Sequence, residues 1–193
     1  MRGIYPEKIS VIIPVYNEES RLKKALKIIV QFYRQQPSWE FILVNDGSTD
    51  DTGKIIKNYK FIKLISYAQN QGKGYALKQG VKQATKPLVL LCDVDFSTPL
   101  TELAKLYQPM LKGVDIVIGS RKVKGAKITK HQLIWREWLG RQFTNLTNLW
   151  LDTKVSDVTC GFKLFTAKAA KKLFSLVRIN RWAYDAEILF LAK

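Results

Sequence analysis

Two carboxylates stand directly after an apolar segment: Asp93 and Asp95 follow Leu-Val-Leu-Leu-Cys at residues 88–92. The length and apolarity of this segment predict a buried strand, so the acids lie at its carboxyl end. Open α/β sheets bind ligands at that edge, and two carboxylates there can share a hard divalent cation such as Mg²⁺ or Mn²⁺, which in turn holds a phosphate. An isolated Asp-x-Asp is also common in ordinary loops, where one acid caps the next helix.

Two more polar clusters each follow an expected strand. Tyr16 and Glu18 come after residues 9–15, and Asp46 comes after residues 41–44. Because the carboxyl ends of parallel strands meet at one edge, we expect all three clusters to converge. Asp46 can accept the imide N–H of a uracil, Tyr16 can stack on its ring, and Glu18 can hold a ribose. The pattern fits a nucleotide-sugar site, with helix capping by Glu18 or Asp46 as the alternative.

Two glycine-containing turns resemble phosphate-binding loops without completing either motif. Gly47 to Lys54 has the wrong spacing for a P-loop, and Ile55 replaces the required Ser or Thr. Gly72-Lys73-Gly74 lacks the third glycine of a dinucleotide fingerprint. Both are typical of turns at helix starts, although Lys73 can still reach a diphosphate.

The elements that must position these residues alternate along the chain. Segments 9–15, 41–44, 61–65 and 88–92 have strand character, and helical apolar spacing follows each of them. This alternation predicts a single α/β domain, with a mainly parallel, Rossmann-like sheet sandwiched by helices. Further on we expect a short strand at 114–118 and helices at 130–151, 167–173 and 183–192.

Charge narrows the possible partners. The chain of 193 residues is 47% hydrophobic, which suits one globular domain, and its formal net charge is +16. Such a charge attracts polyanions: nucleic acid, an anionic membrane surface or phosphorylated substrates. A basic nucleic-acid-binding module is the alternative from another class. Three acidic strand ends would repel a phosphate backbone, so we expect no nucleic acid.

Cysteine usage and hydropathy indicate the compartment. Cys92 and Cys160 have no framework spacing, so we expect reduced thiols in a cytoplasmic location. No segment approaches the ~20 uninterrupted apolar residues of a membrane span, and the first residues lack an apolar signal core. Membrane contact is therefore expected to be peripheral, on the cytoplasmic face, through the tryptophan-bearing helix at 130–151, with burial of Trp135, Trp138 and Leu139 in the core as the alternative.

Five short motifs occur in a fixed order: Pro14-Val15-Tyr16-Asn17-Glu18, Val44-Asn45-Asp46-Gly47-Ser48-Thr49-Asp50, Asn70-Gln71-Gly72-Lys73-Gly74, Asp93-Val94-Asp95 and Ile118-Gly119-Ser120-Arg121. In this order they resemble the motifs of family 2 glycosyltransferases with the GT-A fold. Residues 157–165 and 181–187 resemble the polyprenyl-phosphate transferases of that family, most closely the dolichyl-phosphate β-glucosyltransferases. The likeness spans residues 9–192.

The resemblance implies one GT-A catalytic domain over residues 1–193, with a nucleotide-sugar-binding part at 1–120 and an acceptor-binding part at 121–193. It implies a UDP-sugar donor, Mg²⁺ or Mn²⁺ on Asp93 and Asp95, and a polyprenyl (dolichyl or undecaprenyl) phosphate acceptor. Relatives often continue past the equivalent of Lys193, so we expect a longer chain. The residues that match donor-site motifs are Pro14, Tyr16, Glu18, Asp46, Asn70, Lys73, Asp93 and Asp95.

Two positions depart from the family pattern. Asn45 stands where many relatives have the first of two acids, and Ser97 stands where some mannosyltransferases place a glutamine ligand. The number of metal ligands is therefore open. GDP-mannose as the donor, or a soluble saccharide as the acceptor, is the nearest alternative.

The expected reaction is an in-line attack by a phosphate oxygen on the anomeric carbon of UDP-glucose, with inversion. A phosphate monoester has a second pKa of about 6, so the oxygen is already anionic and needs no general base. Arg121, Arg136 and Arg141 are candidates for the acceptor phosphate, since guanidinium groups bind phosphate bidentately. Arg136 and Arg141 are five positions apart and do not share one helical stripe, so an ordinary solvated charge is the alternative for one of them. The expected catalytic residues are Asp93, Asp95, Arg121 and Asp157. Asp157, Asp185 and Glu187 are expected to orient a cationic partner or sugar hydroxyls.

Overall fold

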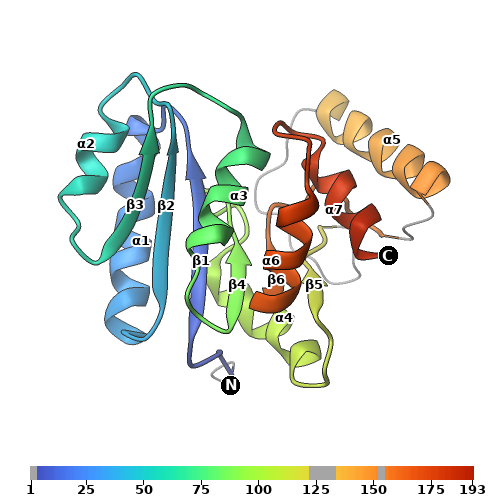
Figure 1. Cartoon of the computed structure of the whole chain (residues 1–193), viewed down its shortest axis with the longest axis horizontal. Coiled ribbons are helices and arrows are strands. Elements are labelled where there is room, and N and C mark those ends of the chain that lie inside the picture. The colour runs from blue at the N-terminus through green and yellow to red at the C-terminus, as the bar shows by residue number, and fades with distance from the viewer. Residues whose placement is uncertain (1–3, 122–133, 152–154) are drawn as a thin grey trace.

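Six strands form one sheet in the order β3-β2-β1-β4-β6-β5 (Figure 1). The computed structural model describes residues 4–121, 134–151 and 155–193, and within 134–151 the side chains of residues 142–150. The strands are β1 (Ile9–Val15), β2 (Glu40–Asp46), β3 (Ile62–Tyr67), β4 (Leu88–Leu91), β5 (Ile116–Ile118) and β6 (Lys163–Thr166). The helices are α1 (Glu19–Gln35), α2 (Thr52–Lys57), α3 (Lys73–Gln83), α4 (Leu103–Met110), α5 (Ile134–Leu151), α6 (Ala167–Leu176) and α7 (Tyr184–Ala192), with the short 3-10 helix η1 (Leu100–Glu102) before α4.

β1 lies at the point where the strand order reverses. The chain runs from β1 to β2 and β3 on one side, then crosses to β4 on the other side, and these four strands are parallel. Ile12 of β1 pairs with Leu91 at the end of β4, and the N–H of Cys92 donates to the Ile12 carbonyl at 3.1 Å. The carboxyl ends of β1 and β4 therefore lie side by side at the point of reversal, where such sheets bind ligands.

Helices cover both faces of the sheet and bury two separate apolar cores. Because successive side chains of a strand point to opposite faces, Val11 and Ile13 of β1 join one core while Ile12 joins the other. The first core contains side chains of α1, α2 and α4, and the second contains side chains of α3, α6 and α7. Two buried faces require nearly continuous apolar strands, and β1, β2 and β4 have them.

The predicted fold class is confirmed: the chain is one α/β domain with a mainly parallel sheet between helices. The expected strands lie within two residues of their observed bounds; the strand expected at 114–118 begins two residues later and spans Ile116–Ile118. The helix expected at 167–173 continues to Leu176. The basic segment of residues 122–127 lies outside the described residues.

β6 was not predicted. It pairs antiparallel with both β4 and β5 and makes the sheet mixed. The sequence at 157–163 favours a turn rather than a strand, because a lysine stands at the start of the short apolar run that follows it. Lys163 is nevertheless fully buried, because its ammonium group is bonded inside the protein.

Both cysteines are free and buried. Burial raises the pKa of the Cys92 and Cys160 thiols, so both are protonated at neutral pH. Among the described helices, none combines the length and apolarity needed to cross a bilayer.

Candidate functional site

Carboxylates from separate loops gather at the carboxyl ends of β1 and β4. Glu18 follows β1, and Asp93 and Asp95 follow β4. Burial raises the pKa of Glu18; Arg21 opposes this rise, whereas the charges of Asp95, Asp50 and Asp93 add to it. Glu18, Asp93 and Asp95, three of the acids predicted at this edge of the sheet, are therefore close enough for Glu18 to be repelled by the other two.

None of the predicted site acids caps the helix that follows it. Glu18 occupies the N-cap position of α1, but its side chain makes no capping hydrogen bond. The N-cap residue of α2 is Asp51, not Asp46, and the N-cap residue of η1 is Pro99, not Asp93 or Asp95. Asp95 Oδ1 instead accepts the backbone N–H two residues later, at 2.9 Å. The capping alternative is therefore wrong for Glu18 and Asp46, and for Asp93 and Asp95.

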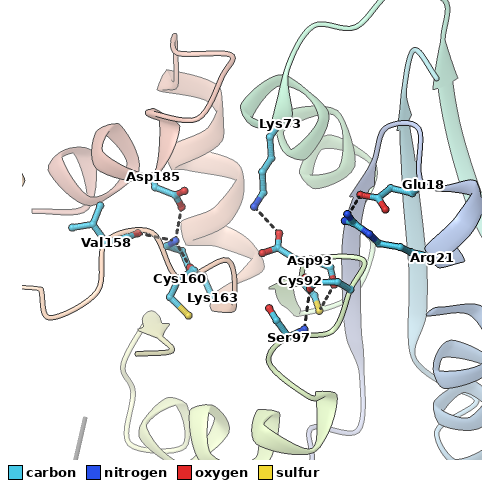
Figure 2. A network of polar contacts seen from close by, with 11 residues as sticks. Glu18, Arg21, Lys73, Cys92, Asp93, Ser97, Val158, Cys160, Lys163 and Asp185 are labelled. Atoms are coloured by element: carbon cyan, nitrogen blue, oxygen red, sulfur yellow. Dashed lines mark hydrogen bonds and ion pairs between the residues drawn. The ribbon is translucent and has the colours of Figure 1, made fainter. Parts of the chain in front are cut away.

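Lys73, the first residue of α3, points at Asp93 (Figure 2), and its Nζ lies 2.5 Å from Asp93 Oδ1. The side chain of Lys73 is 16% exposed and that of Asp93 is 37% exposed. Burial alone would lower the pKa of Lys73, but the charge and hydrogen bond of Asp93 outweigh burial and raise it. Lys73 is therefore a fixed cation beside a carboxylate that solvent still reaches.

The turn that carries the two acids has a strained backbone. Phe96 has φ 47°, in the left-handed region, which costs a bulky residue about 1–3 kcal/mol. Its N–H donates to the Asp93 carbonyl at 3.1 Å, and its ring is 7% exposed in the core beneath the site. Burial of Phe96 in the first core offsets the strain.

Asp46 is bound through both carboxylate oxygens by its own chain. Oδ1 accepts the Tyr67 hydroxyl at 2.7 Å and the Gln71 N–H at 2.8 Å. Oδ2 accepts Asn70 Nδ2 and the Gly72 N–H, each at 2.9 Å. Four donors match the roughly four acceptor positions of a carboxylate. A uracil imide group would therefore have to displace one of them, and the predicted contact stays a prediction.

The remaining predicted donor-site residues differ in their accessibility. Tyr16 follows β1 and is 46% exposed, so its ring can be reached by a ligand. Pro14 lies inside β1, where it pairs with Val44. Asn70 is bonded to the backbone carbonyl of Asp46 as well as to its side chain, so it fixes the loop before α3.

Arg121 and Asp157 form a bidentate ion pair, and the charge of Asp93 also acts on Arg121. Arg121 Nε and Nη2 donate to the two oxygens of Asp157 at 2.8 and 2.9 Å, and Nη2 also donates to Thr159 at 3.0 Å. The hydrogen bonds to Asp157 raise the pKa of Arg121. Asp157 is 1% exposed and orients a cation, as expected. The side chains of Arg136 and Arg141 lie outside the described residues.

Lys163 bonds to the loop of residues 157–162 and to Asp185, as Figure 2 shows. Its ammonium group donates to the carbonyls of Val158 at 3.2 Å and Cys160 at 2.5 Å, and it pairs with the buried carboxylate of Asp185. Sequence reasoning expected a cationic partner for Asp185 but missed Lys163. A lysine next to the apolar residues of β6 was the available signal.

Asp93 and Asp95 supply oxygen ligands of the kind that Mg²⁺ and Mn²⁺ prefer. Within residues 4–121, 134–151 and 155–193, no group of three or more His, Cys, Asp or Glu side chains is arranged to hold a metal ion. A cation bound by one or two carboxylates and by substrate phosphates needs no larger set. The residues present fit a cation whose coordination is completed by a bound diphosphate.

Sequence comparison gives one family and a set of curated relatives. The model described as Glycosyl transferase family 2 matches residues 10–174. A dolichyl-phosphate beta-glucosyltransferase of Trichomonas vaginalis is 34% identical over 200 residues, which cover 96% of this chain and 61% of the relative. The Homo sapiens protein of the same name is 32% identical over 205 residues, 97% of this chain and 63% of the relative. The chain thus spans about three-fifths of the length of these relatives.

Solved structures share the fold at low sequence identity. Glucosyl-3-phosphoglycerate synthase from Mycobacterium tuberculosis, in complex with UDP, superposes with a TM-score of 0.68 at 21% identity over 94% of this chain and 64% of that one. A complex with Mn²⁺, UDP-glucose and phosphoglyceric acid gives 0.68 at 22% identity over 94% and 63%. The mannosyltransferase PcManGT from Pyrobaculum calidifontis, with GDP-Man and Mn²⁺, gives 0.58 at 19% identity over 88% and 47%.

Proposed function

Because the chain belongs to glycosyltransferase family 2, we propose that it transfers glucose from UDP-glucose to a polyprenyl phosphate, dolichyl or undecaprenyl, with inversion at the anomeric carbon. The observation that carries this proposal is the convergence of Glu18, Asp93 and Asp95 at the sheet reversal, with Lys73 fixed against Asp93. The names of the curated relatives favour glucose and dolichyl phosphate over mannose or a soluble saccharide.

Donor binding is assigned to the edge formed by β1, β2 and β4. The exposed ring of Tyr16 stacks on uracil, Glu18 binds the ribose, and Asp46 accepts the imide N–H after releasing one of its own donors. Asp93 and Asp95 would hold Mg²⁺ or Mn²⁺, and the cation would neutralise charge on the departing diphosphate. Lys73 adds a fixed positive charge at the same place.

In the reaction, an anionic oxygen of the acceptor phosphate forms a bond to C1 of glucose while the bond from C1 to the UDP oxygen breaks. The electron pair of that bond leaves with UDP. Arg121, held by Asp157 and Thr159, binds the attacking phosphate with the part of its guanidinium group that these residues leave free. Asp157 is engaged by Arg121, so its role is to orient that arginine.

The acceptor places the reaction at a membrane surface. Phe143, Leu146, Leu149 and Trp150 of α5 are exposed, and the chain carries a net charge of +16. We assign α5 to peripheral contact with anionic lipid on the cytoplasmic face. Flotation of the protein with anionic and with neutral liposomes tests this: preferential flotation with anionic vesicles is expected, and equal flotation or none contradicts it.

The function is tested by radiolabelled transfer from a panel of nucleotide sugars to dolichyl phosphate. UDP-glucose is expected to give a product that partitions into organic solvent and that requires Mg²⁺ or Mn²⁺. If only GDP-mannose gave product, the donor would be GDP-mannose and not UDP-glucose. If no donor gave an organic-soluble product under conditions in which UDP binds, the assignment of a polyprenyl phosphate as the acceptor would be overturned.

A further inference from the structure

The segment of residues 177–183 between α6 and α7, hereafter the α6–α7 loop, is fixed against the start of α3. The Tyr75 N–H donates to the Asn180 carbonyl at 3.1 Å. A β-carbon built at Gly72 would lie 2.5 Å from the Asn180 oxygen, and one at Gly74 would lie 2.6 Å from the Ile179 oxygen. Only glycines allow so close an approach of two backbones. The loop is therefore held beside Lys73, which lies between these two glycines.

The other side of the loop is held by α7. The Glu187 carboxylate accepts the backbone N–H groups of Arg178 and Ile179 at 2.9 and 2.8 Å. Because Glu187 is occupied by the loop backbone, it does not pair with the side chain of Arg178. Among the described residues, the guanidinium groups of Arg178 and Arg181 have no hydrogen-bond or ion-pair partner, and both residues are exposed.

This well-held loop presents large apolar side chains to solvent. Trp182 is 76% exposed and Ile179 is 40% exposed. An indole left in water on a fixed backbone is typical of a binding surface. Lys73 Nζ lies 5.5 Å from the centroid of the Trp182 ring and also contacts Asp93, so one ammonium group joins the loop to the candidate metal carboxylates.

The loop combines two free guanidinium groups with an exposed indole and an exposed isoleucine. A phosphate monoester joined to an apolar chain complements both halves of this surface. Arg121 alone has few free donors for an acceptor phosphate, because its Nε and Nη2 already donate to Asp157 and Thr159.

We propose that the α6–α7 loop is an acceptor-binding surface, where Arg178 and Arg181 bind the phosphate of a prenyl phosphate and Trp182 with Ile179 contacts its first isoprene units. The proposal deepens the proposed function and rests on it. In this proposal, Arg178 and Arg181 bind the acceptor phosphate in addition to Arg121, and the acceptor lies beside Lys73. The stem of Arg181 lies over Gly72, the residue before this lysine.

The experiment compares geranyl phosphate, which has an apolar chain, with methyl phosphate, which has none. For Trp182→Ala we expect KM for geranyl phosphate to rise about tenfold, with kcat, KM for UDP-glucose and KM for methyl phosphate within about twofold of wild type. Trp182→Phe should restore most of the loss. Arg181→Ala should raise KM for both phosphates, because it removes a charge-assisted contact with the head group.

Matched controls separate this loop from general surface effects. Phe190→Ala removes an aromatic ring that is 54% exposed on α7, and Arg34→Ala removes an exposed arginine of α1. Both should leave every KM unchanged. An equal rise in KM for geranyl and methyl phosphate in Trp182→Ala, or a rise for UDP-glucose alone, would overturn the proposal.

Equilibrium dialysis of geranyl phosphate in the presence of UDP and Mn²⁺ keeps the two proposals distinguishable. If wild-type protein binds geranyl phosphate about tenfold more tightly than Trp182→Ala but transfers no glucose, the proposed reaction fails and the loop assignment stands. If both bind equally, the loop assignment fails whatever the outcome of the transfer assay.

Discussion

Gly161 touches Asp93 so closely that a β-carbon at position 161 would lie 2.2 Å from the Oδ2 of that carboxylate. The loop of residues 157–162 therefore limits where the acid after β4 can stand. The same loop carries Asp157 and Thr159, which hold Arg121. One short loop thus spaces a candidate metal ligand from a candidate acceptor ligand.

Replacing Gly161 by alanine should displace the Asp93 carboxylate. We expect affinity for UDP with Mn²⁺ to fall at least tenfold and the protein to lose about 1–3 kcal/mol of stability from overpacking. Gly140→Ala is the matched control, because a β-carbon there meets nothing within 4 Å, and it should leave UDP affinity intact. Calorimetric titration gives the affinity, and urea unfolding gives the stability. Unchanged UDP affinity in Gly161→Ala would show that the contact is tolerated.

The buried pair of Lys163 and Asp185 should matter for activity beyond its effect on folding. Lys163→Met leaves an unpaired buried carboxylate and should cost about 3–5 kcal/mol of stability. Lys163→Met with Asp185→Asn removes both charges and should recover part of that loss. The Val158 and Cys160 carbonyls still lack their ammonium partner in the double variant.

For that double variant we therefore expect a well-folded protein whose kcat is at least tenfold below wild type at saturating donor. The free energy of unfolding and steady-state kinetics are measured on the same preparation. Full recovery of kcat together with stability would mean that the lysine supports the fold alone and does not position the loop.

Asp46→Asn tests whether this carboxylate recognises uracil or only holds the loop before α3. An amide leaves two of its four protein donors without an acceptor, which costs about 1–3 kcal/mol each. If Asp46 accepts the imide N–H, affinity for UDP should fall far more than affinity for CDP, whose base has no N–H at that position. Tyr67→Phe, which removes one donor and keeps the carboxylate, should preserve the preference. Equal losses for UDP and CDP in Asp46→Asn would leave only the loop-holding role.

Glu18→Gln should stabilise the unliganded protein at neutral pH. Burial raises the folded-state pKa of Glu18, so its protonated form is favoured in the folded protein and that contribution to stability is lost as pH rises through the folded pKa. A neutral glutamine removes the cost of the charge. We expect Tm to increase at pH 7 and the difference to vanish below the ordinary pKa of 4.5.

Thermal unfolding from pH 4 to pH 8 measures this dependence. Glu7→Gln changes a side chain that is 83% exposed and should leave Tm unaltered throughout. A lower Tm for Glu18→Gln at pH 7 would contradict the account. Since Glu18 is also assigned to the ribose, its variant should bind UDP more weakly while being more stable.

The sheet and its acidic edge were predictable because both depend on local patterns. Apolar runs ending in Glu18, Asp46 and Asp93 identify strands and the edge at which they finish. The role of each acid at that edge was not predictable from the pattern. A carboxylate that caps a helix and one that faces a ligand have the same place in the sequence, and they differ only in the hydrogen-bond donors that surround them in the fold. The bonds of Asp46 to Tyr67 and to the loop before α3 depend on the register of β2 and β3.

β6 and the role of Lys163 could not be inferred for a different reason. A lysine costs too much to bury alone, so the pattern there favoured a turn. Its partner Asp185 is 22 residues away, and only the packing of α7 brings the two together. The arrangement of the α6–α7 loop likewise depends on two glycines of another element.

The central claim is that the acidic edge binds a nucleoside diphosphate through a divalent cation, and calorimetric titration of UDP in the presence of Mn²⁺ tests it most directly. We predict a saturable binding heat that disappears with a chelator and weakens at least tenfold in Asp95→Asn. Asp115→Asn, an exposed acid just before β5 at the opposite edge of the sheet, should bind as wild type does. No heat from wild-type protein, or equal heat with and without the chelator, would contradict the account.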